Sequence, residues 1–385
     1  MMDSIELLQR LVRIPSPNPP GDTRAIADFV AAEMRAIGCE LRTPAPEAKP
    51  EARNATATLG EGSPVIMLHA HIDTVPIAKN EADKWHVDPY AGVVKDGALY
   101  GKGSIDDKAP LASMMLAMAD AARQDALRGT LILVAAAEEE VGGQLGTKWL
   151  ADNGHLPSCD FIVVGEQTGN KVATAHKGVM RASVHTGGKA VHATNPDRGV
   201  NAIVAMSKLI AALDSYHKEL ANRVHPVVGV PTCNIGVIEG GSTANAVPDA
   251  CHIQLDRRMI PREDPKAVIN ELKAVVESVD IAPATADIDS FVYSPWFDSG
   301  LDTELGQIFL SCVREQLNAD PGPIGYLPGS DAKHLMDLAR GDMIIFGPGS
   351  YEAAHAYDEH VELAAYQATT DILLDFLRRT LYRVN

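Results

Sequence analysis

The chain has 385 residues and a formal net charge of −17, from 34 Lys and Arg against 51 Asp and Glu. This length favours two domains, while the negative charge argues against nucleic acid or an anionic membrane as a partner, since both need a basic surface. No apolar stretch reaches the roughly 18 residues of a membrane span, and five scattered cysteines without CxxC spacing indicate reduced thiols in a cytoplasmic protein.

The first half of the chain alternates helix and strand patterns. Residues 1–14 have the pattern of an amphipathic helix and none of the regions of a signal peptide. Asp22 is expected to cap a second helix that ends at Gly38. Short apolar runs then alternate with helical patterns, and these runs lie at 65–68, 131–137 and 161–164. Such runs are typical of buried parallel strands, so we expect an α/β fold with a helix-covered, mostly parallel sheet.

The pattern changes at about Lys177. From there to about Ser290, strand and helix patterns follow one another as in two β-α-β units. Two such units predict a ferredoxin-like α+β insert with an antiparallel sheet. Helix–strand alternation then resumes. We therefore expect a catalytic domain formed by residues 1–176 and 291–385, interrupted by an inserted domain at 177–290.

Four apolar runs, including a later one at 343–346, lead into side chains that can bind metal or transfer protons. These side chains are His71 and Asp73, Glu138 to Glu140, Glu166, and His355. In open α/β sheets, ligands bind outside the carboxyl ends of the strands. Two histidines and several carboxylates at one edge of one sheet therefore predict a metal site.

Several of these residues also have a structural interpretation. The pair His71-x-Asp73 is a weak indication by itself, although a carboxylate beside a ligating histidine commonly fixes its orientation. His69 lies on the same face of the strand, but one strand seldom gives two ligands to one ion, so we expect a structural role for it. Asp106 or Asp107 could simply cap the helix that follows.

The run Glu138-Glu139-Glu140 is the sharpest single signal. Three carboxylates at the end of an apolar strand repel one another, which is costly unless cations offset the charge. On a solvated helix the same run would be unremarkable. Two histidines and three carboxylates suit two zinc ions bridged by one carboxylate. Two dications, three carboxylates and one bridging hydroxide then sum to zero charge.

At these residues, from the segment IPSPNPPG to the segment AHAYDEHV, the chain resembles a family of dinuclear-zinc deacylases and exopeptidases. That family includes acetylornithine deacetylase, succinyl-diaminopimelate desuccinylase, aminoacylase and carboxypeptidase G. The resemblance implies that His71, Asp106 and Glu166 bind one Zn²⁺. It also implies that Glu140 and His355 bind a second Zn²⁺, with Asp106 bridging the two. Co²⁺ or Mn²⁺ could serve in place of zinc.

The resemblance assigns further roles. Glu139 matches the family's general acid/base, and Asp73 matches the carboxylate behind the zinc-binding histidine. His192, in the insert, matches a histidine that reaches the partner's active site as an oxyanion donor, although by itself it would be read as a histidine of a surface loop. A homodimer formed through this dimerisation or lid domain is therefore expected.

Substrate contacts are implied at three more positions. Asn245 and Arg258 match residues that hold the substrate's carboxylate or backbone. Arg257 is a competing candidate for the role of Arg258. Gly329 matches a loop beside the substrate. The chain departs from the family pattern at 68–70 and 261–263, and it has Gln167 where Pro is usual, but no ligand is lost.

The resemblance implies a zinc-dependent amidohydrolase that removes an N-acyl group from an amino acid by attack of a metal-activated water. Acetylornithine deacetylase and succinyl-diaminopimelate desuccinylase are the nearest types, because Glu166 is Glu where aminopeptidases and many dipeptidases of the family have Asp. A dipeptidase or carboxypeptidase acting on a short peptide is the alternative. A binding protein that keeps only the fold would be expected to lose site residues, and here every ligand and Glu139 are present.

Overall fold

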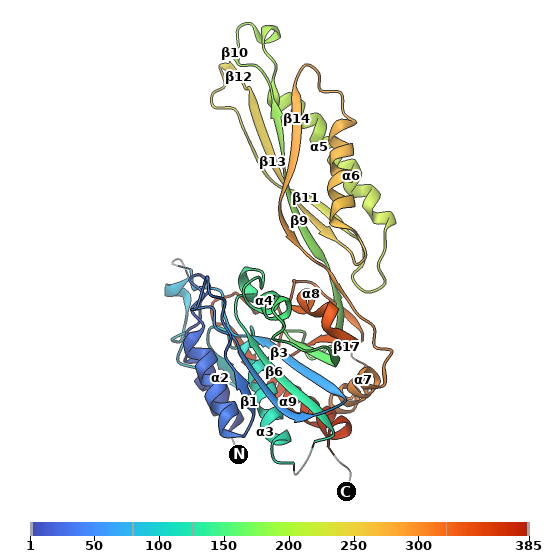
Figure 1. Ribbon diagram of the computed structural model, residues 1–385. Helices are drawn as coiled ribbons and strands as arrows, with labels where there is room; N and C mark the ends of the chain where they lie inside the picture. Colours follow the sequence, from blue (N-terminus) through green and yellow to red (C-terminus); the bar gives the residue numbers. More distant parts are fainter. Residues whose placement is uncertain (1–2, 79–80, 125–126, 321, 383–385) are drawn as a thin grey trace. The chain divides into compact units, whose positions relative to one another are not determined.

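The computed structural model of the protein describes residues 3–78, 81–124, 127–320 and 322–382 (Figure 1). The chain divides into two compact units. Unit 1 comprises Met1–Thr174 and Ser299–Asn385, and unit 2 comprises Ala175–Asp298. Each unit has its own cluster of buried hydrophobic side chains. Met1 and Met2, with which the expected first helix begins, lie outside the described residues.

Within the described residues, the larger sheet has nine strands and a parallel centre. Its order is β1-β2-β6-β3-β7-β17-β8-β15, with β16 paired to β8. The neighbours among β6, β3, β7 and β17 are parallel, whereas the strands at both ends pair antiparallel. The strands are β1 (Glu40–Arg42), β2 (Ala55–Glu61), β3 (Val65–His71), β6 (Gly129–Ala136), β7 (Cys159–Gly165), β8 (Ala173–His176), β15 (Phe297–Asp298), β16 (Ile324–Tyr326) and β17 (Ala339–Phe346).

The four central strands contain the four apolar runs of the sequence. They are buried along most of their length, because helices and loops cover both faces of a parallel sheet. The expected α/β fold with a mostly parallel centre is thereby confirmed. The carboxyl ends of β3, β6, β7 and β17 lie along one edge of this sheet, where ligands bind in such folds.

The helices of unit 1 pack on this sheet and on one another. α3 contacts β3, β6 and α9, and α9 contacts α7. The helices are α1 (Ser4–Val12), α2 (Arg24–Ala36), α3 (Lys108–Ala121), α4 (Thr147–Asp152), α7 (Glu304–Leu317), α8 (Ala332–Leu335) and α9 (Leu363–Thr380), with the short η1 (Ala82–Lys84), η2 (Glu139–Val141) and η5 (Met336–Leu338). The N-cap of α2 is Thr23 rather than the expected Asp22. No helix among the described residues has the length and apolar character needed to cross a membrane.

A small three-stranded sheet joins two segments that are distant in the sequence. β18 (His360–Glu362) pairs antiparallel with β5 (Ala98–Tyr100), and β5 pairs with β4 (Val93–Lys95). This pairing places the segment that follows His355 beside the segment that precedes Asp106.

Unit 2 has the expected ferredoxin-like arrangement. Its antiparallel sheet has the order β11-β13-β9-β14, with α5 between β9 and β11 in the chain and α6 between β13 and β14. β14 crosses the expected domain boundary at 290, because it pairs with β9 as an edge strand. The elements are β9 (Gly178–Gly187), β10 (Val191–His192), η3 (Pro196–Arg198), α5 (Ala202–Glu219), η4 (Leu220–Asn222), β11 (Thr232–Gly240), β12 (Ala246–Val247), β13 (Ala250–Met259), α6 (Pro265–Glu277) and β14 (Thr285–Ser294).

Candidate metal centre

The five side chains expected to bind metal converge in unit 1 as two groups that share one carboxylate. Ligand atoms of His71, Asp106 and Glu166 lie within 4.8 Å of one another, and so do those of Asp106, Glu140 and His355. Asp106 Oδ1 lies 2.8 Å from His71 Nε2, whereas Asp106 Oδ2 lies 3.1 Å from His355 Nε2. The two oxygens of Asp106 therefore face different groups, as those of a bridging carboxylate do.

The donor set fits divalent cations. Imidazole and carboxylate groups are the ligands of catalytic zinc sites. Burial, together with the charge of Asp106, raises the pKa of Glu166 well above its ordinary value. Clustered buried carboxylates of this kind are costly unless cations offset their charge. The residues present thus match what two metal ions would require.

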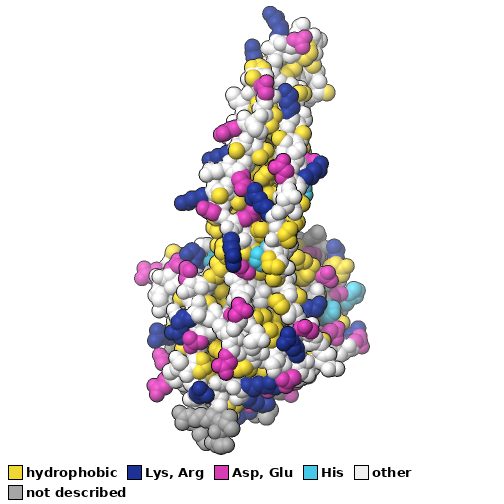
Figure 2. Space-filling view, turned by 90° about the vertical axis from the view of Figure 1, so that its right-hand side faces the viewer, with side chains coloured by type: hydrophobic (Ala, Val, Ile, Leu, Met, Phe, Trp, Pro, Cys, Tyr) yellow, Lys and Arg dark blue, Asp and Glu magenta, His cyan; other side chains and the backbone are white. Residues whose placement is uncertain are grey.

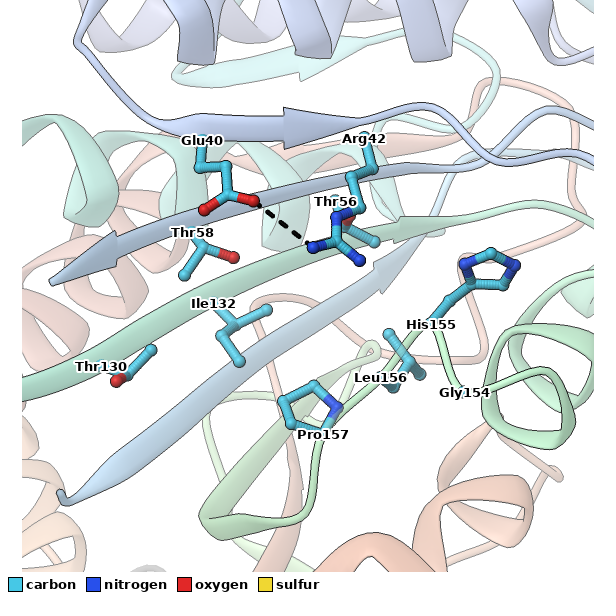
Figure 3. Close-up of a pocket in the computed structure, with 10 residues that line it drawn as sticks. All are labelled: Glu40, Arg42, Thr56, Thr58, Thr130, Ile132, Gly154, His155, Leu156 and Pro157. Atoms are coloured by element: carbon cyan, nitrogen blue, oxygen red, sulfur yellow. Dashed lines mark hydrogen bonds and ion pairs between the residues drawn. The ribbon is translucent and has the colours of Figure 1, made fainter. Parts of the chain in front are cut away.

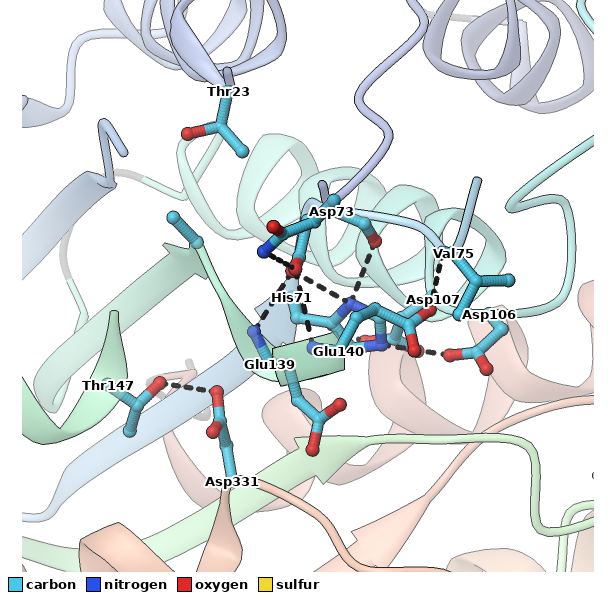
Figure 4. Close-up of polar contacts among 12 residues, drawn as sticks. Thr23, His71, Asp73, Val75, Asp106, Asp107, Glu139, Glu140, Thr147 and Asp331 are labelled. Atoms are coloured by element: carbon cyan, nitrogen blue, oxygen red, sulfur yellow. Dashed lines mark hydrogen bonds and ion pairs between the residues drawn. The ribbon is translucent and has the colours of Figure 1, made fainter. Parts of the chain in front are cut away.

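Asp73 fixes the turn that carries two of the glutamates (Figure 4). Its carboxylate accepts the backbone N–H groups of Glu139 (3.1 Å) and Glu140 (3.3 Å) and the side-chain amide of Asn18 (2.9 Å). The His71 Nδ1 lies 3.0 Å from the backbone oxygen of Asp73 and 3.5 Å from its Oδ1. Asp73 therefore orients His71 and holds the Glu139–Glu140 turn against the end of β3.

Each of the three consecutive glutamates has its own basic partner. The pairs are Glu138 with Lys49, Glu139 with Lys333 at 3.6 Å, and Glu140 with His355 at 3.1 Å. Glu138 adopts a left-handed backbone conformation with φ of 69°, which directs the three successive side chains to different surroundings. Two lysines thus offset part of the charge of the glutamate run, while Glu140 faces His355, which belongs to the same candidate ligand group.

Glu139 has the surroundings of a general base. Burial raises the pKa of its carboxyl to about 7, and the Lys333 ammonium opposes this rise. A carboxyl group with a pKa near neutrality can accept and return a proton at physiological pH. Lys333 is itself buried, with 4% of its side chain exposed.

Four of the five candidate metal ligands line a cavity of about 220 Å³. Its lining residues are Asp106, Glu139, Glu140, Glu166, Gln167, Tyr326, Pro328, Gly329, Tyr351, Ala354 and His355. A side cavity of about 330 Å³ shares Gln167, Tyr326 and Tyr351 with it and extends along Thr168 to Lys171. Gly329, expected beside the substrate, is therefore placed at the metal centre.

Two residues that the sequence analysis did not assign to the site hold candidate ligands. The Gln167 amide donates to Asp106 Oδ2 at 3.0 Å, and the Tyr326 hydroxyl donates to Glu166 Oε2 at 2.9 Å. Both side chains are buried. The departure from Pro at position 167 was the one sequence signal that could have pointed to Gln167.

His69 takes part in a buried network beside the site. Its Nε2 lies 2.7 Å from the Thr147 hydroxyl. That hydroxyl donates to Asp331 at 2.6 Å, a bond drawn in Figure 4. Burial lowers the pKa of His69 to about 4, so its imidazole is neutral at physiological pH. His69 belongs to neither of the two ligand groups.

The three remaining expected site residues lie in unit 2. His192 pairs with Ala246 between β10 and β12, and the Ala193 N–H donates to the backbone oxygen of Asn245 at 2.9 Å. His192 and Asn245 are therefore neighbours, and both are exposed. Arg258 lies on β13, with 37% of its side chain exposed.

Arg257, the competing candidate, has a different environment. Its side chain is fully buried, lies 2.6 Å from Glu263 and donates to the Tyr216 hydroxyl at 3.1 Å. These contacts account for its charge within the core of unit 2, which leaves Arg258 as the accessible guanidinium of the pair.

A further cavity of about 300 Å³ lies over β1, β2 and β6 (Figure 3). Exposed Glu40 and Arg42 form an ion pair across it at 3.4 Å, and Thr56, Thr58 and Thr130 line its floor. None of the expected site residues lines this cavity.

The chain is similar to known proteins along most of its length. Residues 67–379 match the peptidase family M20/M25/M40. Acetylornithine deacetylase from Proteus mirabilis is 28% identical, over 96% of this chain and 94% of that protein. A Staphylococcus aureus protein named "Probable succinyl-diaminopimelate desuccinylase" is 31% identical, over 83% of this chain and 84% of that protein.

The fold is also shared with solved structures. A metallo-carboxypeptidase of the M20 family from Sulfolobus solfataricus superposes with a TM-score of 0.78 at 16% identity, over 98% of this chain and 99% of that chain. The family match covers most of this chain, including all five candidate metal ligands. The chain therefore belongs to the peptidase family M20/M25/M40 and is a metallohydrolase.

Proposed function

We propose that the protein is a zinc-dependent amidohydrolase that removes an N-acyl group from an amino acid. The observation that carries this proposal is the position of Asp106, whose two oxygens face separate histidines beside the half-buried carboxylate of Glu139. The names of the two relatives, a deacetylase and a desuccinylase, support deacylation.

Two metal ions would be held by the groups described above. His71, Asp106 and Glu166 would hold one Zn²⁺, and Asp106, Glu140 and His355 would hold the other. When bound, such ions lower the pKa of a water molecule and polarise an acyl carbonyl. Co²⁺ or Mn²⁺ accepts the same nitrogen and oxygen donors.

Glu139 performs the proton transfers in this mechanism. Its carboxylate takes a proton from the attacking water and returns it to the nitrogen of the departing amine. Asp73 keeps Glu139 in place by accepting its backbone N–H. An imidazole N–H of His192 from the partner subunit stabilises the oxyanion of the tetrahedral intermediate.

The amino acid part of the substrate is held by its carboxylate. Arg258 makes the charge-assisted contact, and Asn245 and Gly329 contact the substrate backbone. The exposed side chain of Arg258, in contrast to the fully buried Arg257, supports this choice. The side cavity beside Gln167 and Tyr326 offers room for the acyl group.

A homodimer through unit 2 completes the site in this proposal. β11 is an edge strand whose second half is exposed, and it carries the exposed apolar residues Val237 and Ile238. Unit 2 shows hydrophobic side chains among scattered charged ones (Figure 2). An unpaired edge with apolar side chains is suited to pairing with a second copy. A fully active monomer in light scattering would refute the role of His192 in the partner's site.

We also place the protein in the cytoplasm. All five cysteines are free and buried, and unpaired thiols are typical of reducing compartments. Its substrate would then be a small metabolite or a short peptide.

Amine release by the zinc-loaded protein tests the proposed function. The substrates would be N-acetyl-ornithine, N-succinyl-diaminopimelate, other N-acyl amino acids and simple dipeptides. We expect hydrolysis of an N-acyl amino acid, and we expect Glu139→Gln to bind zinc normally but to lose at least about 10²-fold in turnover. Preference for dipeptides would make the protein a dipeptidase or carboxypeptidase, and near-normal activity of Glu139→Gln would refute its role.

A further inference from the structure

The carboxylate of Glu359 is buried against the loop that carries Asp106. The side chain is 1% exposed, and its Oε1 accepts the backbone N–H groups of Ile105 at 3.2 Å and Asp106 at 3.4 Å. No site residue of the sequence analysis occupies this position. Glu359 thus contacts the backbone of the one residue that both ligand groups share.

The second oxygen of Glu359 faces a buried cation. Lys102 Nζ lies 3.1 Å from Glu359 Oε2, and Lys102 is 3% exposed. The backbone oxygen of Glu359 also accepts the Gly101 N–H at 2.9 Å. Side chain and backbone of Glu359 together therefore hold both ends of the segment from Gly101 to Asp106.

This clamp connects the two loops that supply the shared carboxylate and one histidine. Glu359 follows His355 closely in the chain and directly precedes β18, which pairs with β5 just before the Asp106 loop. The strand pairing alone would fix the ends of these loops. The Glu359 carboxylate extends the connection to the backbone of Asp106 itself.

An ion pair at this depth is a poor source of stability. Taking both charges out of water costs several kcal/mol per ion, and replacing such a pair by apolar groups is often neutral. The Glu359–Lys102 pair is therefore better explained by the geometry that it fixes than by the stability that it adds.

Resting on the metal assignments of the proposed function, we propose that Glu359 is a positioning residue for the dinuclear centre. With Lys102 it fixes the Asp106 backbone, so that the carboxylate of Asp106 keeps the orientation in which its two oxygens face the two ligand groups. Because Asp106 belongs to both ligand groups, a less firmly held Asp106 weakens the binding of both ions together.

Zinc release tests the proposal without any substrate. The variants are Glu359→Gln, Lys102→Met and the double variant, with Glu362→Gln as the control, because Glu362 lies on β18 with 62% of its side chain exposed. Zinc transfer to a chromogenic chelator and the melting temperature of the metal-free protein would be measured for each. We expect Glu359→Gln to release both ions at least about tenfold faster than the wild type and Glu362→Gln.

The double variant separates positioning from stability. Since it removes both members of the ion pair, its metal-free melting temperature should lie closer to that of the wild type than that of Glu359→Gln does, while zinc release should stay fast. If the double variant released zinc as slowly as the wild type, the positioning role of Glu359 would be refuted and the proposed function would remain intact. A wild-type protein that binds fewer than two ions would overturn both.

Discussion

The Nζ of Lys333 lies 3.6 Å from Oε1 of Glu139. Lys333 belongs to the segment that also brings Gly329 to the candidate metal cavity, so one loop supplies both a cavity wall and the cation next to the proposed general base. Burial raises the pKa of Glu139 to about 7, and Lys333 acts in the opposite direction. The two effects hold the carboxyl group near the pH at which it must exchange protons.

Lys333→Met should therefore change the pH dependence of the reaction. The proposed mechanism requires the base form of Glu139, so kcat/KM should fall as the pH drops through the pKa of this group. Removing the cation raises that pKa and should move the acid limb of the profile to higher pH.

The profile would be measured on zinc-loaded protein between about pH 5 and 9. Lys148→Met is the control, since Lys148 pairs with Asp152 at 2.7 Å on the exposed side of α4. An acid limb that stays in place, or moves to lower pH, would contradict the electrostatic role of Lys333.

Tyr326→Phe should weaken metal binding without disturbing the fold. The change removes the hydroxyl that donates to Glu166 Oε2 at 2.9 Å and keeps the ring that fills the cavity wall. Loss of such a hydrogen bond to a ligand typically costs 10- to 100-fold in metal affinity, so we expect about that loss in a chelator competition.

Tyr351→Phe is the matched control for this experiment. Tyr351 lines the same cavity, but among the described residues its hydroxyl makes no hydrogen bond to a candidate ligand. Equal zinc affinities for the two phenylalanine variants would show that the Tyr326 hydroxyl does not orient Glu166.

The sequence predicted the parts of the site that lie at strand ends. His71 and Glu166 follow apolar runs, and runs of this kind are recognisable as buried strands because no polar residue interrupts them. Glu138 to Glu140 were predicted for the same reason. The order of strands in the sheet then places these ends at one edge, as the rule for parallel sheets requires.

The supporting residues could not be predicted in the same way. Tyr326 and Lys333 are distant in sequence from the glutamates that they contact, and no periodic pattern links them. Glu359 lies in the same segment as His355, but the resemblance to the family assigned a role to His355 alone. Their roles depend on contacts that exist only once the chain has folded.

The two adjacent arginines of β13 should behave differently when replaced. Arg257→Met removes a fully buried guanidinium that bonds Glu263 and Tyr216 and leaves Glu263 with Arg223 at 3.1 Å, so we expect a loss of about 1–3 kcal/mol in stability. Arg258→Met removes an exposed side chain, so stability should change by no more than about 0.5 kcal/mol, while KM for an N-acyl amino acid should rise.

Trp296, whose indole donates to the Glu263 backbone at 3.0 Å, provides a fluorescence signal for urea unfolding of unit 2. Destabilisation by Arg258→Met, or a raised KM with Arg257→Met alone, would reverse the two assignments.

The side cavity bears on the choice between acetyl and succinyl substrates. Among the described residues that line it, Lys171 is the only charged one, in a chain whose net charge is −17. Backbone hydrogen bonds anchor the preceding turn, with Gly169 and Asn170 donating to Gly349 and Gly347 at 2.5 and 2.9 Å. The Lys171 side chain thus extends from an anchored turn. A carboxylate at the end of an acyl group could form a charge-assisted contact with its ammonium group.

Lys171→Met should therefore raise KM for an N-succinyl amino acid by about tenfold, which corresponds to the 1.4 kcal/mol of one charge-assisted contact. KM for the N-acetyl derivative of the same amino acid should not change, because an acetyl group has no carboxylate that could contact Lys171. Lys95→Met, at an exposed position on β4, should leave both values unchanged. An equal effect of Lys171→Met on both substrates would place Lys171 outside the acyl site, and the discrimination between acyl groups would then have to come from the uncharged walls formed by Tyr326 and Tyr351.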